Sequence, residues 1–168
     1  KINLENFSVN KINFKEQHYI NKIIFGFEGN FWLECNSSKT LSFDIIKLYF
    51  LKKRSLLDIL EGNFLFYVIN PSERKIEFFT DITCSVPLYY KISDNFLTCG
   101  TDLRQVVGKS NQIHKNFLFY LEKYKNFPSS YLPFKGIRKI DPGYNVFIDK
   151  DMRIINHGFD FKNCCAMS

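Results

Sequence analysis

The sequence predicts an α+β domain built on antiparallel β-sheets. Three observations carry this prediction: strand-like runs lie on both sides of helical segments, short turns join most consecutive strand runs, and 45% of the residues are hydrophobic. Phe and Tyr occur 19 and 9 times, so we expect a core rich in aromatic rings. No internal repeat or low-complexity linker interrupts the 168 residues, which fit one domain.

The first expected elements are two strands and a helix. Residues 22–27 read as a strand, residues 28–30 (Glu-Gly-Asn) supply the residue types of a turn, and residues 31–34 return as a second strand. Residues 43–54 place apolar side chains at helical spacing after Ser42, a suitable N-cap. A helix is therefore expected there.

A hairpin is expected in the next part of the chain. Residues 55–60 first continue as a short helical turn, which Gly62 can end by adopting a left-handed conformation. The apolar run 64–69 and the run 75–80 then flank a turn at 70–74 that contains Asn, Pro and Ser. These two runs should pair as antiparallel strands.

A second hairpin and two helices follow. Strands are expected at 88–92 and 96–99, joined by Ser-Asp-Asn at 93–95. Thr101-Asp102 can cap a helix that runs through about residue 107, and another helix is expected at 115–125. The apolar stripe of that last helix comprises Phe117, Leu118, Leu121 and Tyr124.

The C-terminal part is again strand-like. Strands are expected at 137–140, 144–148 and 153–156. Asp-Pro-Gly at 141–143 and Asp-Lys-Asp at 149–151 supply the two turns between them.

The formal charge of +6 does not indicate a nucleic-acid partner. Lys and Arg are spread along the chain, and the densest run, residues 52–54, falls at an expected helix end where cations are favourable. A nucleic-acid interface needs a clustered basic stripe with reading side chains, and no such signature occurs.

The sequence contains neither a signal peptide nor an apolar run long enough to cross a membrane. The first residue is Lys, so the N-terminus is expected to be trimmed or preceded by a removed tag. The five cysteines lack the spacing of a disulfide framework, which favours a reducing cytoplasm. They are Cys35, Cys84, Cys99, Cys164 and Cys165.

No metal or cofactor site is expected. The three histidines, His18, His114 and His157, are scattered and form no i, i+4 pair. Cys84 and Cys99 lie on neighbouring expected strands, where buried cysteines act as small hydrophobic residues.

Four segments, in order, resemble the front domain of asparagine synthetases. Residues 56–70 resemble the stretch in which L-x-G-x-F-A-F enters a central strand, and residues 81–90 resemble D-R-x-G-x-x-P-L-Y-Y. Residues 96–103 stand where that family has F-A-S-E-x-K-A-L, and residues 136–144 are similar to G-I-x-x-L-x-P-G-x. The resemblance covers about residues 42 to 160.

This resemblance implies an N-terminal-nucleophile hydrolase fold, an αββα sandwich of two stacked antiparallel β-sheets flanked by helices. Residues 1–161 would form the glutamine-amidotransferase-like domain, and residues 162–168 a flexible tail that contains two cysteines.

The chain departs from the family at the residues that hydrolyse glutamine. The family's nucleophile is an N-terminal Cys whose own amine serves as base, but the first cysteine here is Cys35. Ile82 and Cys84 replace the Arg and Gly of D-R-x-G. The oxyanion-binding N-G-E is scrambled into residues 29–31, and the glutamine-binding S-D-T-E is reduced to residues 42–44.

A relict ligand pocket is therefore expected around Gly29, Asn30, Asp44 and Asp81, without a catalytic residue. Asp81 keeps the family's Asp, and without the following Arg it is expected to accept hydrogen bonds at a strand end rather than to act as an acid or base.

A nucleophile-free front domain also resembles the asparagine-synthetase-like cyclases that close lasso peptides. In those, it supports a C-terminal ATP-using domain, whose S-G-G-x-D-S loop is absent here. We therefore expect a non-catalytic binding or scaffolding domain, with a protein or peptide partner, in a synthetase or in peptide natural product biosynthesis.

Two other functions remain open from the sequence. The chain could be a folded precursor whose Cys164-Cys165 tail is post-translationally modified or binds a soft metal. It could instead be an active amidohydrolase whose N-terminal nucleophile is missing from this sequence.

Overall fold

The computed structural model describes residues 2–3, 16–33, 42–52, 60–108, 112–124, 132–142, 144–148 and 154–158. Within these residues the strands form two antiparallel sheets, of six and four strands, accompanied by helices. The predicted α+β class with two antiparallel sheets is confirmed. The chain divides into two compact units: a six-stranded unit (Phe14–Val86 and Pro142–Ser168) and a four-stranded unit (Lys1–Asn13 and Pro87–Asp141).

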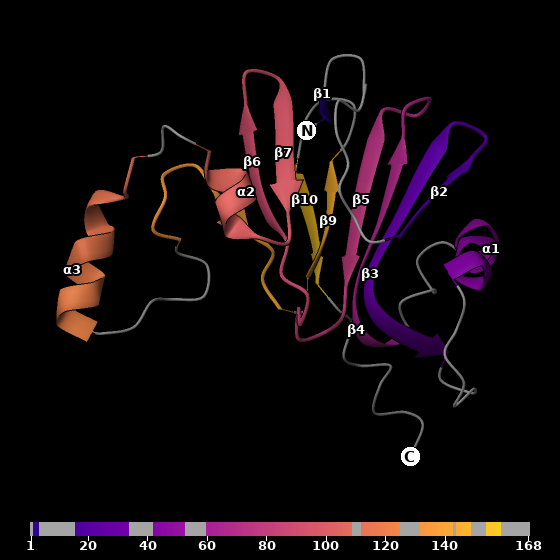
Figure 1. Cartoon of the computed structure of the whole chain (residues 1–168), viewed down its shortest axis with the longest axis horizontal. Coiled ribbons are helices and arrows are strands. Elements are labelled where there is room, and N and C mark those ends of the chain that lie inside the picture. The colour runs from indigo at the N-terminus through magenta and orange to yellow at the C-terminus, as the bar shows by residue number, and fades with distance from the viewer. Residues whose placement is uncertain are drawn as a thin grey trace. The chain divides into compact units, whose positions relative to one another are not determined.

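The six-stranded unit has the strand order β10-β9-β5-β4-β3-β2, and every neighbouring pair is antiparallel (Figure 1). Helix α1 (Ser42–Lys52) covers one face of this sheet, where its Ile45 and Ile46 enter the core. The strands are β2 (Glu16–Ile20), β3 (Ile23–Leu33), β4 (Leu60–Asn70), β5 (Lys75–Thr80), β9 (Tyr144–Ile148) and β10 (Ile154–Gly158).

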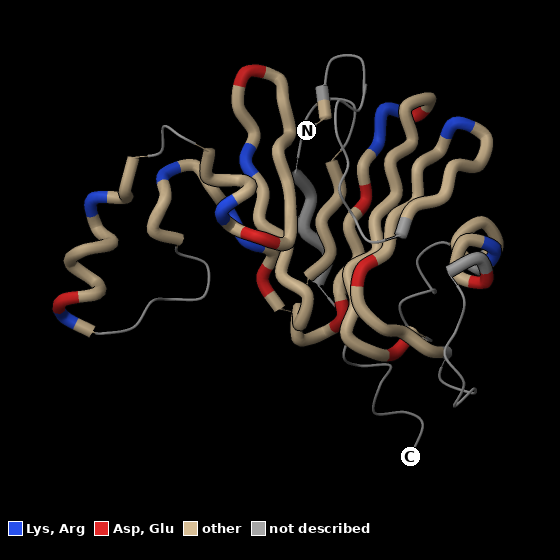
Figure 2. Tube along the Cα trace, in the orientation of Figure 1, with Lys and Arg blue, Asp and Glu red and all other residues tan. Residues whose placement is uncertain are grey.

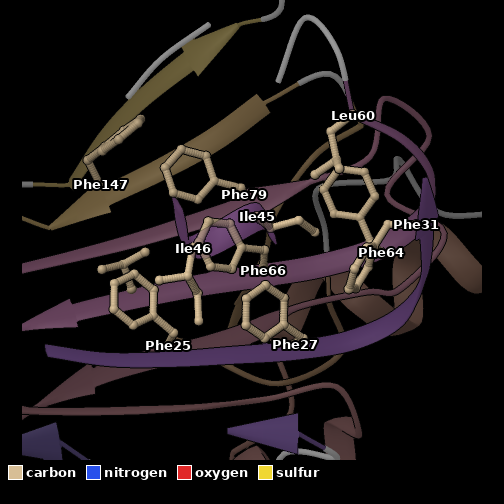
Figure 3. Close-up of a cluster of buried hydrophobic side chains, with 11 residues drawn as sticks. Phe25, Phe27, Phe31, Ile45, Ile46, Leu60, Phe64, Phe66, Phe79 and Phe147 are labelled. Carbon is tan, nitrogen blue, oxygen red and sulfur yellow. The ribbon is translucent and has the colours of Figure 1, made fainter. Parts of the chain in front are cut away.

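Stacked phenylalanines fill the core beneath α1 (Figure 3). The Phe66 ring lies between two others, with its centroid 4.8 Å from that of Phe27 and 5.3 Å from that of Phe79. All three come from adjacent strands and point to the same face because side chains alternate along a strand. The high Phe content thus builds a cross-strand ring stack, with each close ring pair contributing about 0.5–1.5 kcal/mol beyond its buried area.

A buried polar contact joins α1 to the sheet. The Tyr49 hydroxyl donates to Glu77, which is only 6% exposed, and the Lys75 ammonium lies 2.7 Å from the other Glu77 oxygen. Burial, followed by the hydrogen bond to Glu77 and the negative charge of Glu77, raises the pKa of Tyr49 well above its usual range. Tyr49 therefore stays protonated in the folded chain at alkaline pH.

This shift predicts a contribution to alkaline unfolding. Above the ordinary tyrosine pKa of about 10, Tyr49 ionises in the unfolded chain but not in the folded one, so stability falls as pH rises. Urea unfolding at about pH 8 and about pH 11 should show a smaller alkaline loss for Tyr49→Phe than for the wild type. Tyr19→Phe, at a position 68% exposed, is the control. Equal losses in all three proteins would contradict the assignment.

Strand β3 is continuous, so the turn expected at residues 28–30 is wrong. Ten register pairs join β3 to β4, from Ile24–Ile69 to Leu33–Leu60. Gly29 and Gly62 have φ values of +98° and +126°, and a Cβ at Gly29 would lie 2.0 Å from the Asn63 carbonyl oxygen. The glycines therefore permit close approach of two paired backbones rather than a turn.

The helix end expected at Gly62 is wrong for the same reason, because β4 already begins at Leu60 and Gly62 lies inside it. The remainder of the helical turn expected at 55–60 lies outside the described residues, as does the end of the preceding helix beyond Lys52. Strand β2 was not predicted. Its hairpin with β3 turns at Asn21 and Lys22, both at positive φ.

Gly26 has a different role, since the Tyr67 ring of the neighbouring strand lies directly over it. A Cβ at Gly26 would lie 2.0 Å from the ring carbons Cε1 and Cζ of Tyr67, and Tyr67 is fully buried. The ring occupies the space that a side chain would need.

Gly26→Ala should therefore lower the free energy of unfolding by about 1–3 kcal/mol, because the Tyr67 ring must move within a packed core. Urea denaturation measures this change. Gly100→Ala is the matched control, since the nearest heavy atom to its Cβ beyond its chain neighbours, Gln105 Oε1, would lie 3.5 Å away. A loss at Gly26 no larger than that at Gly100 would contradict the packing argument.

The chain leaves the six-stranded sheet after Thr80 and re-enters it at Tyr144. The Thr80 amide donates to Asn145 Oδ1 over 3.0 Å, and the Thr80 hydroxyl donates to the Tyr144 carbonyl over 3.2 Å. Thr80 and Asn145 are both buried. The exit and return points are thus joined by buried hydrogen bonds.

The four-stranded unit has the strand order β1-β7-β6-β8. Its strands are β1 (Ile2–Asn3), β6 (Tyr89–Ser93), β7 (Phe96–Gly100) and β8 (Arg138–Lys139), and its helices are α2 (Leu103–Val107) and α3 (Lys115–Tyr124). Asp102 caps α2 by accepting from the Arg104 amide, as predicted. The hairpin expected at 88–99 is confirmed, whereas β1 was not predicted.

The apolar stripe expected on α3 is not buried. Leu118, Leu121 and Tyr124 are 61%, 45% and 56% exposed, and no residue of α3 is buried. The sequence pattern therefore identified a helix but not a core-facing surface. No helix in the described part of the chain is long and apolar enough to span a membrane.

Candidate functional site

The most densely bonded polar side chain of the described chain is Asp81, directly after β5. The backbone amides of Phe64, Thr83 and Ser85 donate to its carboxylate over 3.0–3.1 Å, and the Thr83 hydroxyl donates over 2.6 Å. The Ser85 hydroxyl lies 3.0 Å from Asp81 Oδ1. The side chain thus organises a tight turn, as Asp does in Asx-turns, and joins it to β4 at Phe64.

These contacts keep Asp81 ionised. Its side chain is 5% exposed, and burial alone would raise its pKa. Hydrogen bonds from Thr83, Ser85 and the Phe64 amide outweigh that effect and hold the pKa of Asp81 below its usual value. Asp81 is therefore a strand-end acceptor, as expected from the sequence.

The structure brings three of the four expected pocket residues to one end of the β3–β4 pair. Gly29 pairs with Phe64, whose amide bonds to Asp81, and Asn30 pairs with Asn63. Asp44 lies half-buried in the first turn of α1, and no hydrogen bond within the described residues joins it to the Asp81 turn.

The two substituted positions of the D-R-x-G segment flank this turn. Ile82 is 44% exposed and brings no charge where the asparagine synthetases have Arg. Cys84 has φ +52°, a conformation that favours glycine, and its buried Sγ lies 3.8 Å from the Val86 carbonyl oxygen. Position 84 thus has a backbone conformation that usually favours glycine, although a cysteine occupies it.

Within the described residues, neither Cys84 nor Cys99 forms a disulfide. Burial raises the pKa of Cys99 to about 11, and Cys84 is buried. Cys35, Cys164 and Cys165 lie outside the described residues. Within the described ranges, no group of three or more His, Cys, Asp or Glu side chains is placed to hold a metal.

Sequence reasoning missed a neighbouring pair. Trp32 and Glu61 are register partners, and the Trp32 indole N–H donates to Glu61 Oε2 over 2.8 Å. Next to them, Asn63 Oδ1 lies 3.2 Å from the Ser85 hydroxyl. Only the correct pairing of β3 with β4 would have revealed this surface.

Asp81→Asn should lower the free energy of unfolding at neutral pH by about 2 kcal/mol, because hydrogen bonds to a charged acceptor are lost. The depressed pKa means that the wild-type contribution is present above the unfolded value of about 3.9 and is lost as pH falls through the lower folded pKa. Denaturation between about pH 7 and pH 2 should show a weaker acid dependence in the variant. Asp94→Asn, in an exposed turn, is the control, and identical acid profiles for Asp81→Asn and wild type would contradict this role.

Comparisons with known proteins identify the fold. No protein-family model matches the chain, and no curated protein sequence matches it. The glutamine phosphoribosylpyrophosphate amidotransferase of B. subtilis, solved with ADP and GMP, matches with a TM-score of 0.50 at 9% identity over 86% of this chain and 31% of that chain. A structure described as the allosteric regulatory enzyme of purine biosynthesis matches with a TM-score of 0.46 at 14% identity, over 93% of this chain and 32% of that chain.

The chain therefore shares its fold with the matched third of the B. subtilis amidotransferase structure. It spans about a third of the length of the solved structures that it matches.

Proposed function

We propose that this chain is a non-catalytic glutamine-amidotransferase-like domain that binds or scaffolds a partner in an asparagine-synthetase-like or peptide-modifying system. The proposal rests on the hydrogen bonds of the Asp81 carboxylate. Its buried carboxylate is occupied by donors from its own turn and by the Phe64 amide of β4, and the uncharged Ile82 follows it. Such a carboxylate supports the turn and has little capacity left to hold a substrate.

The thiols support the same proposal. Glutamine hydrolysis by this class of domain needs a thiolate nucleophile with a base beside it. Burial raises the pKa of Cys99, which disfavours its thiolate, and Cys84 is enclosed within the Asp81 turn. The described cysteines thus serve packing.

The partner is proposed to be a protein or peptide, supplied by an ATP-using synthetase domain or by peptide-modifying enzymes, in the cytoplasm. The exposed polar side chains Asn30, Asn63 and Ser85 beside the Asp81 turn support a contact surface rather than an enclosed substrate pocket. They offer both donors and acceptors for hydrogen bonds with another chain.

The purified chain should release ammonia from glutamine no faster than buffer alone, because both cysteines in the described part of the chain, Cys84 and Cys99, pack within the structure instead of presenting a thiolate beside a base. An active glutaminase assayed in parallel provides the control. Ammonia release that a thiol-alkylating reagent abolishes would contradict the non-catalytic assignment.

Co-purification of an ATP-using synthetase chain from the native host is the expected result for the scaffolding role, and its absence from such purifications would count against that role.

A further inference from the structure

The adjoining ends of β3 and β4 present an exposed polar and aromatic surface. Trp32 pairs with Glu61, and Asn30 pairs with Asn63. Because side chains alternate along a strand, these four share one face, while Phe31 between Asn30 and Trp32 is buried in the core beneath α1. Glu61, Asn30 and Asn63 are exposed, and Trp32 is 39% exposed.

Among the described residues, this end of the sheet is acidic although the whole chain carries +6. Segments 23–33, 60–70 and 76–88 contain no Lys or Arg. Figure 2 shows acidic residues where β3 ends and β4 begins, and basic residues mainly at the hairpin turns of the opposite end. The carboxylates of the three segments are Glu28, Glu61, Glu77 and Asp81.

Unlike the buried carboxylates of Glu77 and Asp81, the Glu61 carboxylate is accessible to a partner molecule. Glu77 is bonded to Lys75 and Tyr49, and Asp81 is bonded within its turn. Glu61 is exposed, and within the described part of the chain it accepts from the Trp32 indole and forms no ion pair. The indole hydrogen bond orients the ring and the carboxylate together on one face.

We infer that Trp32 and Glu61 form a binding site for an arginine side chain on an extended segment of a partner protein. A guanidinium can lie against the indole ring while it pairs with the carboxylate, since Arg combines planarity with a fixed charge. Asn30 and Asn63 can bond to the backbone of the same segment. This inference rests on the proposed binding role and names the partner's chemistry.

Trp32 is the sole tryptophan of the chain, so its emission reports on this site alone. The full chain is titrated with a short acetylated and amidated peptide that carries a central Arg, and with the same peptide carrying neutral citrulline. The Arg peptide should change the Trp32 emission saturably and bind about three- to tenfold more tightly than the citrulline peptide, the range expected of one cation–π contact with one exposed ion pair. The difference should shrink as salt is added.

Titration calorimetry with two variants tests whether the Arg peptide binds at Glu61. Glu61→Gln should weaken the Arg peptide by about two- to fivefold, the share of the ion pair, and leave the citrulline peptide unchanged. Glu73→Gln, exposed in the β4–β5 turn at the other end of the sheet, is the matched control and should bind as the wild type does. Unchanged thermal unfolding of both variants ensures that only the contact is tested.

Equal binding of the two peptides, or an Arg affinity unaffected by Glu61→Gln, would overturn the site. The two proposals fail separately. Thiol-dependent glutamine hydrolysis with intact Arg selectivity would reject the non-catalytic role and keep the site, whereas loss of Arg selectivity without hydrolysis would reject only the site.

Discussion

The pairing of β3 with β4 is the constraint on which the rest of the six-stranded unit depends. Gly29 and Gly62 allow the two backbones to approach at positions where a Cβ would collide with a carbonyl oxygen. That pairing aligns Phe27 with Phe66, and Phe66 in turn stacks on Phe79 of the next strand. The ring stack provides the surface on which α1 lies. Strand β4 also holds the Asp81 turn.

The contacts of the Asp81 turn serve to hold the loop in place. Its carboxylate binds amides and hydroxyls of its own loop, and the left-handed backbone at Cys84 keeps the loop's path without glycine. A non-glycine residue in that conformation costs about 1 kcal/mol, which the surrounding hydrogen bonds offset. The turn therefore forms without an arginine at position 82 and without a glycine at position 84.

Local signals recovered much of the fold. Asn-Pro-Ser at residues 70–72 and Asp94-Asn95 marked hairpins correctly, because turn chemistry is read from adjacent residues. The glycine at position 29 was read as a turn because its real cause, the carbonyl of a strand about 34 residues later, is invisible locally. The exposed face of α3 shows the same limit, since periodicity predicts a helix but not what covers it.

The candidate site was predicted to the extent that it follows from the family pattern. Asp81 was recognised within its motif, and its role as an acceptor followed from the missing Arg. The Trp32–Glu61 pair was not, since its members lie 29 residues apart and meet only through strand register. Asp44 was grouped with the others by motif alone, and it lies in the first turn of the helix that its own segment predicts.

The strands of the six-stranded sheet come from two segments of the chain that are synthesised at different times. Strands β2 to β5 are made first, but β9 and β10 follow only after the 55-residue stretch from Pro87 to Asp141 of the other unit. Until then the outer side of β5 lacks its partner, and Thr80 lacks the Asn145 acceptor. The nascent chain therefore carries an open, aromatic-rich edge for several seconds at ordinary synthesis rates, which makes this interval its time of greatest exposure to misassembly.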